Sequence, residues 1–367
     1  MSWCDGEDRT MRRFATLCAA ALFGFAFGSA NPTPAASQDL PQTRVRVVGY
    51  FSNLLQTREL EQPFWAQRIP EASGGRITAE YANQDTVGIR DFQILRVLQQ
   101  GVTDFGSTDI SKMAGDDPVF EGCDLAGMVN DIHTARRACE AWRAAMAESM
   151  ERKFNVRLLA LFPNPSIVYW CNQPIRGLED LRGKRVRVFN ITQGDFVRAV
   201  GAAAVTIPFP EVVPAMQRRV VDCGLTGTLS GNAAGWPEVT THLLTLNAGW
   251  SIAFQAVNLD AWRRFPPAVQ QFFTEQFAKL ENDLWALMDR ATEQGIACNI
   301  GRPDCTMGRP GRMTLVPVPE ADQARRTQLL NEVVLPAWAR RCGRPCAERW
   351  NREVGPIVNL TIPLDRL

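Results

Sequence analysis

Strand-like and helix-like patterns alternate along this chain, and the alternation restricts the folds that it can adopt. Residues 44–49 alternate apolar and polar side chains as a half-buried strand does, and residues 57–72 have the spacing of an amphipathic helix. A strand pattern follows at 76–81, then a helix pattern at 91–100 and a short strand pattern at 102–105. Strands separated by helices of this length predict an α/β fold with mainly parallel sheets.

A short segment recurs within the chain. Residues 98–106 (LQQGVTDFG) and 216–224 (MQRRVVDCG) have the same Gln, Val, Asp and Gly at four matching places. Each copy has the pattern of a helix end, a tight turn and a buried strand. We interpret the two copies as parts of two similarly built lobes.

The second copy lies in another series of alternating patterns. We expect strands at 168–171, 184–188, 220–226 and 251–258, and helices at 134–147, 193–200, 211–219, 266–294 and 320–341. Residues 295–312 are rich in Gly, Pro and Cys and predict a surface loop, and Pro336 should kink the last helix.

The first thirty residues have the pattern of a secretory signal. A basic segment at residues 11–13 precedes an apolar run at 14–27 that ends in small residues, so we expect cleavage near Ala30. An uncleaved membrane anchor is the alternative, and either Met1 or Met11 is the true start. The sequence thus predicts an exported protein whose residues 31–43 form a flexible segment.

Cysteine usage agrees with export. Eight cysteines remain after the predicted signal: Cys123, Cys139, Cys171, Cys223, Cys298, Cys305, Cys342 and Cys346. An even number in an exported chain predicts disulfides, but the sequence leaves their pairing open. The close pairs Cys298/Cys305 and Cys342/Cys346 either staple local loops or pair with each other. A four-thiolate zinc site is the less favoured alternative, and we expect no metal.

Charge and motifs argue against several classes of function. The chain has 40 Lys and Arg against 39 Asp and Glu, so no overall field exists to hold nucleic acid or an anionic membrane. Its two histidines, His133 and His242, are expected to be structural or exposed. No phosphate loop, nucleophile elbow or dinucleotide fingerprint is present. We therefore expect no catalytic residues, no cofactor and no enzymatic activity.

The strand at 184–188 carries the best binding candidate. Alternation places Val186 and Val188 on one face and Arg185 and Arg187 on the other. A guanidinium offers a planar fork of donors that fits a carboxylate with two parallel hydrogen bonds. The pattern alone favours the other interpretation, in which both arginines are solvated on an exposed strand face.

At this strand the sequence resembles the solute-binding proteins of tripartite ATP-independent periplasmic (TRAP) transporters, including those that bind C4-dicarboxylates. That family has a Leu-Lys-Gly-Leu-Lys-Ile-Arg-Val run, which stands here as LRGKRVRV at 181–188, followed by PFPEVVPAMQRRVVD at 208–222. Features similar to those of the family also occur at 64–76, at 99–104 and in the long helix pattern at 266–294. The resemblance covers nearly all of the chain after the predicted signal.

The resemblance implies a two-lobed periplasmic binding protein with a hinge and a long helix that spans both lobes. It would capture a small organic acid by hinge closure and deliver it to TRAP membrane permease subunits. The resemblance also implies that Arg187 binds the carboxylate of the ligand. We expect the first lobe to comprise 44–165 and about 246–285, and the second to comprise 166–245 and about 286–367. A periplasmic sensor, or a two-lobed periplasmic enzyme acting on a carboxylate, is the alternative.

The chain departs from the family near the expected site. Segment 163–169 has no arginine, so Asn164 and Ser166 are the nearest candidates there, and Thr226 lies in a hydroxyl-rich, uncharged stretch. Arg219 stands where the family has a glycine. One arginine with neutral partners favours a monocarboxylate or a hydroxylated acid. Further candidates for the cleft wall are Tyr50, Trp170, Phe189 and Asn190.

Overall fold

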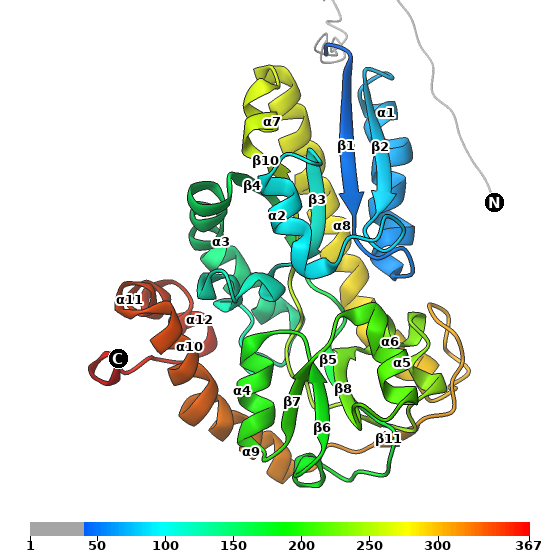
Figure 1. The fold of residues 1–367 in the computed structure, drawn as a ribbon, viewed down its shortest axis with the longest axis vertical. Coiled ribbons are helices and arrows are strands. Elements are labelled where there is room, and N and C mark those ends of the chain that lie inside the picture. The colour runs from blue at the N-terminus through cyan, green and yellow to red at the C-terminus, as the bar shows by residue number, and fades with distance from the viewer. Residues whose placement is uncertain (1–39) are drawn as a thin grey trace, which may run out of the picture. The chain divides into compact units, whose positions relative to one another are not determined.

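Two β-sheets with flanking helices make up the described part of the chain (Figure 1). The computed structural model describes residues 40–367, so the predicted signal peptide and residues 31–39 of the predicted segment 31–43 lie outside the described residues. Within residues 40–367, no helix has the length and apolar content needed to cross a bilayer.

The first sheet contains five strands in the order β2-β1-β3-β10-β4. Their bounds are β1 (Thr43–Gly49), β2 (Ile77–Asn83), β3 (Phe105–Asp109), β4 (Val156–Phe162) and β10 (Ala253–Asn258). Strand β1 pairs in parallel with β2 and β3, whereas β10 runs antiparallel to β3 and β4. We call this sheet the first lobe, together with its helices α1 (Ile69–Ala72), α2 (Ile94–Gln99), α3 (Ile132–Phe154) and α7 (Leu259–Arg264).

The second sheet contains six strands in the order β11-β9-β5-β8-β6-β7. Their bounds are β5 (Ile167–Cys171), β6 (Arg185–Val188), β7 (Ala203–Thr206), β8 (Cys223–Gly227), β9 (His242–Leu244) and β11 (Thr314–Val316). Strand β6 is parallel to β7 and β8, whereas β5 is antiparallel to β8 and β9. With α4 (Ile191–Ala199), α5 (Val212–Gln217) and α6 (Thr228–Ala233), this sheet is the second lobe.

Three segments connect the lobes ahead of the C-terminal helices, which join them again. The chain crosses from β4 to β5 at 163–166 and returns from β9 to β10 at 245–252. The third connection is α8 (Pro267–Asn299), which packs on β4 in the first lobe and on α6 in the second. The first strand after each crossing, β5 in the second lobe and β10 in the first, runs antiparallel to both of its neighbours. Each sheet is therefore mixed, with one antiparallel strand.

Helices α6 and α8 approach each other closely at one glycine. A Cβ on Gly295 would lie 2.4 Å from the backbone nitrogen of Leu229 and 2.5 Å from the carbonyl carbon of Thr228. Real Cβ atoms do not approach backbone this closely, so the absence of a side chain at Gly295 allows the contact.

The last helices run from the second lobe to the first. Helix α9 (Glu320–Leu329) continues through a π-helical turn into α10 (Leu335–Cys342), followed by α11 (Arg344–Glu353) and α12 (Gly355–Val358). The π turn packs on α4, whereas α11 and α12 pack on α3. The indole nitrogens of Trp338 and Trp350 donate to the carbonyl oxygens of Pro118 and Gly122 in the first lobe.

All eight cysteines of the described chain form disulfides. The bonds join Cys123 to Cys139, Cys171 to Cys223, Cys298 to Cys305 and Cys342 to Cys346. The two close pairs therefore staple local loops, and the alternative of a shared four-thiolate zinc site is wrong.

Most of the predicted elements are confirmed, with differences at their ends. Helix α3 extends to Phe154, and α8 continues to Asn299, so the loop predicted from residue 295 begins later. The predicted last helix is present, and its π turn at Leu330–Val334 directly precedes Pro336. His242 is the first residue of β9, and His133 is exposed on α3.

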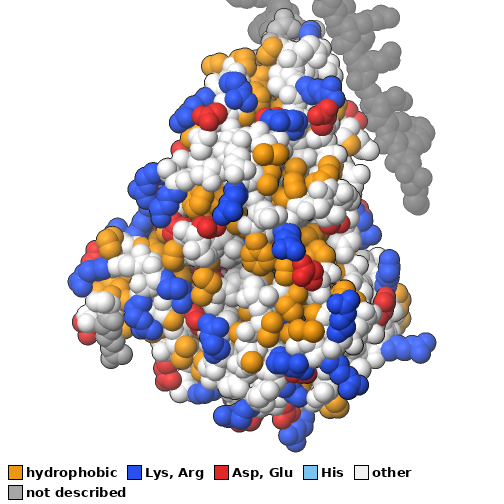
Figure 2. All heavy atoms as spheres, in the orientation of Figure 1, with side chains coloured by type: hydrophobic (Ala, Val, Ile, Leu, Met, Phe, Trp, Pro, Cys, Tyr) orange, Lys and Arg blue, Asp and Glu red, His pale blue; other side chains and the backbone are white. Residues whose placement is uncertain are grey.

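The surface view agrees with the small net charge. On the face shown in Figure 2, basic and acidic side chains lie interspersed with apolar ones.

Candidate functional site

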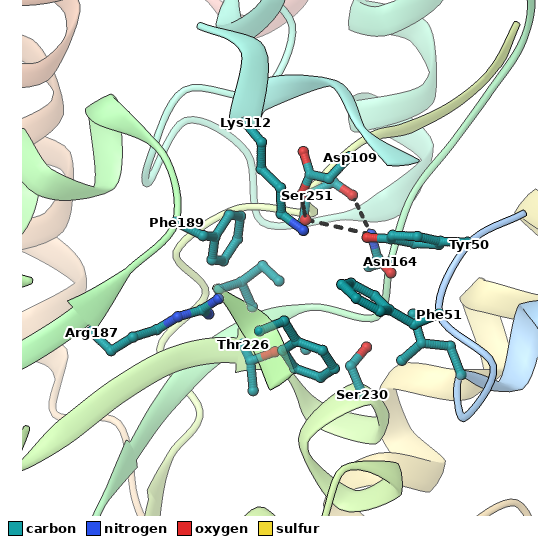
Figure 3. A pocket seen from close by; sticks show the side chains of 14 residues that line it. Tyr50, Phe51, Asp109, Lys112, Asn164, Arg187, Phe189, Thr226, Ser230 and Ser251 are labelled. Carbon is teal, nitrogen blue, oxygen red and sulfur yellow. Dashed lines mark hydrogen bonds between the residues drawn. The ribbon is translucent and has the colours of Figure 1, made fainter. Parts of the chain in front are cut away.

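A cavity lies where strands of both sheets end (Figure 3). Side chains that follow β1 and β3 in the first lobe and β6 and β8 in the second line it, together with residues from both crossings. The lining residues are Tyr50, Phe51, Leu54, Asp109, Lys112, Asn164, Ile167, Arg187, Phe189, Phe209, Thr226, Gly227, Ser230 and Ser251. Its open volume is about 20 Å³, which is room for about one water molecule. The carboxyl ends of strands are a common ligand position in α/β folds.

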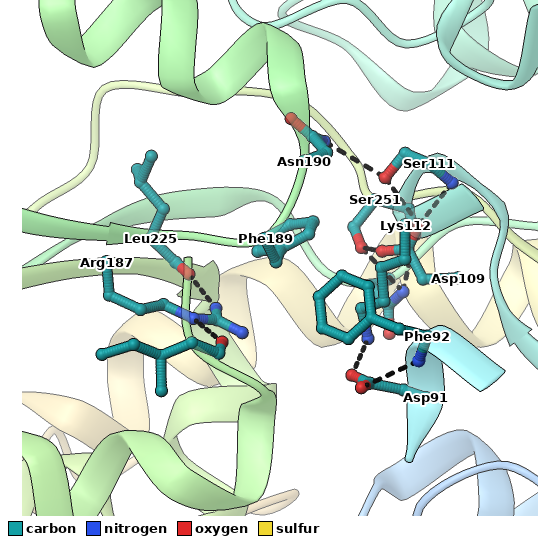
Figure 4. A network of polar contacts seen from close by, with 12 residues as sticks. Asp91, Phe92, Asp109, Ser111, Lys112, Arg187, Phe189, Asn190, Leu225 and Ser251 are labelled. Atoms are coloured by element: carbon teal, nitrogen blue, oxygen red, sulfur yellow. Dashed lines mark hydrogen bonds and ion pairs between the residues drawn. The ribbon is translucent and has the colours of Figure 1, made fainter. Parts of the chain in front are cut away.

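Arg187 reaches into this cavity from β6. Its side chain is buried, its Nε donates to the carbonyl oxygen of Ile207 at 3.0 Å, and its Nη1 donates to that of Leu225 at 2.7 Å. Within residues 40–367, Arg187 forms no ion pair, and its Nη2 makes no hydrogen bond. Two carbonyls thus fix the guanidinium and leave one nitrogen, with two N–H groups, available toward the cavity (Figure 4).

The Arg187 guanidinium remains charged at neutral pH although it is buried. Desolvation lowers the pKa of Arg187 to about 10, while the negative charges of Asp91 and Asp109 act in the opposite direction. Three aromatic rings surround the charge, since the guanidinium carbon lies 5.0 Å from the centre of Phe189, 5.8 Å from Trp236 and 6.0 Å from Phe209. Ring faces attract a cation, so these contacts compensate part of the lost hydration.

A second cation, Lys112, enters from the first lobe. It lies in the short turn Ile110–Met113 that follows β3, and its side chain is only 4% exposed. Its Nζ is 2.6 Å from Oδ2 of Asp91, which is 1% exposed. The expectation that Arg187 has only neutral partners in the site is therefore wrong, because Lys112 and Asp109 line the same cavity.

Asp109 is a buried carboxylate at the end of β3. Its Oδ1 accepts hydrogen bonds from the backbone nitrogen and hydroxyl of Ser111 at 2.9 and 2.7 Å, and its Oδ2 accepts one from the hydroxyl of Ser251. Burial raises the pKa of Asp109, while Lys112 and these hydrogen bonds oppose the rise. Ser251 belongs to the second crossing, so this carboxylate ties the crossing to the first lobe.

Five of the eight predicted site residues line the cavity: Tyr50, Asn164, Arg187, Phe189 and Thr226. Asn164 accepts a hydrogen bond from Gln56 at 2.8 Å and donates one to the carbonyl oxygen of Ser251 at 2.6 Å.

The other three predicted residues lie outside the lining. Ser166 accepts a hydrogen bond from Asn247 at 2.7 Å. Asn190 donates to the hydroxyl of Ser111 at 3.1 Å, which joins the second lobe to the first. Trp170 packs edge-on against Trp236 in the core. The role of all eight residues in ligand binding stays a prediction.

Four further lining residues were not predicted from the sequence: Lys112, Asp109, Phe209 and Ser251. The recurring segment contains a signal for the first two. If the alignment of the two copies is extended beyond their strands, Asp109 aligns with Gly227 and Lys112 aligns with Ser230. All four of these residues line the cavity. A search beyond the ends of both copies would have found them.

Within residues 40–367, no group of three or more His, Cys, Asp or Glu side chains is arranged to hold a metal ion. Arg187, Lys112 and Asp109 line the cavity, and Asp91 pairs with Lys112 beside it.

Comparison with known proteins decides the family. The family model for bacterial extracellular solute-binding proteins, family 7 (DctP), matches residues 52–300. The chain belongs to this family of TRAP solute receptors. It is 28% identical over 159 residues to the sialic acid-binding periplasmic protein SiaP of Vibrio cholerae, a match that covers 43% of this chain and 49% of SiaP.

Solved structures of the family share the fold. DctP7 of Bordetella pertussis, an extracytoplasmic receptor that binds pyroglutamic acid, has a TM-score of 0.76 at 20% identity, covering 85% of this chain and 99% of DctP7. A TRAP solute-binding protein of Desulfovibrio salexigens with bound orotic acid has a TM-score of 0.75 at 19% identity, covering 86% of this chain and 99% of that protein. The two-lobed α/β fold with its long helix α8 is thus confirmed. The family consists of solute-binding receptors, and this chain is one of them.

Proposed function

We propose that this receptor captures a small organic acid in the periplasm, between its two lobes, and delivers it to TRAP membrane permease subunits. The observation that carries the proposal is the Nη2 group of Arg187, a buried cation with free donors that faces a cavity lined by both lobes. A carboxylate bound there makes charge-assisted hydrogen bonds away from water, where they are strong.

The size of the cavity supports capture by hinge closure. An organic acid of several heavy atoms does not fit into about 20 Å³, so the two lobes must separate to admit it. Such a motion would act on the connections at 163–166 and 245–252, on α8 and on the C-terminal helices, all of which join the lobes. Closure around the acid then removes it from solvent.

The related receptors support an acid as the ligand. DctP7 binds pyroglutamic acid, and the Desulfovibrio receptor holds orotic acid. Each is a small ring compound with one carboxylate. The aromatic rings of Tyr50, Phe51 and Phe189 in this cavity suit a flat ligand of that kind.

A thermal-shift screen of mono- and dicarboxylic acids, followed by calorimetry on the acids that raise the melting temperature, tests the proposal. Arg187→Gln should weaken binding of such an acid at least 100-fold, because a charged donor pair is lost. Arg185→Gln is the matched control, because Arg185 lies two residues away on the same strand and pairs with Asp222 outside the cavity. Its affinity should stay within twofold of the parent.

Two results would contradict the proposal. If no acid stabilises the parent protein, the ligand class is wrong. If a folded Arg187→Gln variant binds the acid as tightly as the parent does, the site is wrong. Delivery is tested separately: uptake of the identified acid into vesicles that contain the TRAP permease subunits should require this receptor.

A further inference from the structure

Lys112 has an arrangement that a purely structural ion pair does not require. Its Nζ has three N–H donors, and among residues 40–367 only Asp91 accepts a hydrogen bond from it. The ammonium also lies 5.2 Å from the ring centre of Phe51 and 5.8 Å from that of Tyr50, and all three residues line the cavity. Two donors of a buried cation are thus available beside the space where a ligand would lie.

Cations from both lobes approach the same aromatic ring. The ring centre of Phe189 is 5.9 Å from Nζ of Lys112 and 5.0 Å from the guanidinium carbon of Arg187 (Figure 4). Lys112 belongs to the first lobe and Arg187 to the second. A ligand that contacts both cations therefore connects the lobes directly.

We propose that Lys112 is a second ligand-binding residue, and that it and Arg187 together hold a small monocarboxylate that carries a further, uncharged oxygen acceptor. The inference rests on the proposed function and specifies its ligand. In this arrangement Arg187 binds the carboxylate, while Lys112 donates to a hydroxyl or carbonyl oxygen at the other end of the acid and keeps its ion pair with Asp91.

The charges of the cavity favour a monoanion. Arg187 and Lys112 are matched by two buried carboxylates, Asp91 and Asp109. With both aspartates ionised, one added carboxylate leaves a single excess negative charge and a dicarboxylate leaves two; with Asp109 protonated, they leave none and one. Excess charge is costly in a site shielded from water. Lys112 already has Asp91 as its counter-ion, so it meets a neutral acceptor more readily than a second carboxylate.

Paired probes test the role of Lys112 by calorimetry. Pyroglutamate and cyclopentanecarboxylate have the same ring size and one carboxylate, but only pyroglutamate has the additional carbonyl oxygen; L-lactate and propanoate form a second pair. We expect the parent to prefer the oxygenated acid of at least one pair at least tenfold. Lys112→Met should reduce that preference to less than threefold.

Lys153→Met is the matched control. Lys153 also lies 2.6 Å from a buried aspartate, Asp117, but neither residue lines the cavity. The Lys153→Met substitution should leave the preference for the oxygenated acid unchanged. If both lysine variants behave alike, the inference is wrong.

A second variant covers the case in which Lys112→Met leaves Asp91 unpaired and the protein does not fold. Asp91→Asn removes a negative charge near Arg187 and so strengthens binding of both acids of a pair, but it also frees Lys112 from its counter-ion, so affinity for the oxygenated acid should rise about fivefold more than affinity for its partner. A purely structural Lys112 predicts no such gain, and that result would overturn the inference. If acids bind through Arg187 without any preference for an added oxygen, only the inference fails; if no acid binds the parent, the proposed function fails instead.

Discussion

Asp222 accepts three hydrogen bonds from Arg185, from its backbone nitrogen at 2.9 Å, from Nε at 3.1 Å and from Nη2 at 2.8 Å. Asp104 accepts the same three from Arg46, at 2.8, 3.3 and 3.0 Å. The two aspartates occupy the same place in the recurring segment, just before β8 and β3. The sequence repeat therefore corresponds to a repeated contact that fixes the start of a central strand in each lobe.

Replacing either aspartate should destabilise the fold. Asp222→Ala or Asp104→Ala leaves a strand nitrogen without its acceptor and removes a charged pair, so we expect each to lower the free energy of unfolding by about 1–3 kcal/mol. Urea titration measures the change. Glu179→Ala breaks the exposed pair with Arg182 and should cost less than about 0.5 kcal/mol. Equal losses in all three variants would contradict this account.

The turn before Asp222 contains a strained residue. Arg219 has a φ of 57°, and its counterpart in the first copy, Gly101, has a φ of 66°. Arg219→Gly should raise the free energy of unfolding by about 0.5 kcal/mol, because the left-handed backbone is less costly for glycine, although glycine also gains freedom in the unfolded chain. Gly101→Arg should lower it by about 1 kcal/mol. Chemical denaturation of both variants checks that the two signs are opposite.

Burial of Glu121 predicts a dependence of stability on pH. Glu121 Oε1 accepts a hydrogen bond from the backbone nitrogen of Thr192 in α4, and desolvation raises the pKa of Glu121 from 4.5 to about 7. Between these values the folded chain binds the proton more tightly than the unfolded chain does. The free energy of unfolding should therefore fall as the pH rises from about 4.5 to 7, by about 3 kcal/mol at most.

Glu121→Gln should remove this share of the pH dependence, which melting temperatures at pH 5, 6, 7 and 8 would show. Asp124 has its pKa raised to about 7 by burial as well, so Asp124→Asn should remove a separate share. A Glu121→Gln variant with the slope of the parent would show that Glu121 does not titrate in this range.

Two glycines in helices should respond to alanine with opposite signs. Gly295→Ala places a methyl group against the backbone of α6 and should cost about 2 kcal/mol or more. Gly194→Ala in α4 meets only the flexible end of the Arg198 side chain, at 3.1 Å, and should add about 0.5–1 kcal/mol because alanine favours helix. Thermal unfolding distinguishes the two outcomes.

The elements that could be predicted from the sequence are those whose apolar side chains recur with a regular period. The strands around Val47 and Val186 and the long helix α8 have strong periodicity, so they were identified close to their observed bounds. Strands β7, β9 and β11 are only three or four residues long, and their pairing comes from neighbours distant in sequence. None of the three alternates apolar and polar side chains along its length, so no periodic signal reveals them.

Site residues could be predicted from the sequence only where they lie in the segments that resemble the family or in the recurring segment. Arg187 follows from the strand that resembles the family. The position of Lys112 beside Phe189 depends on how two lobes meet, and residues 77 apart in the chain have no local signal for such a contact. The pairing of Cys171 with Cys223 likewise depends on β5 lying beside β8 in the sheet.

The path of the last helices has a practical consequence for measuring the motion of the receptor. Because Trp338 and Trp350 anchor them to Pro118 and Gly122, a fluorophore attached near the C-terminus reports the position of the first lobe. A second dye on the edge strand β7 would report the second lobe, so energy transfer between the two dyes would follow opening and closing in real time.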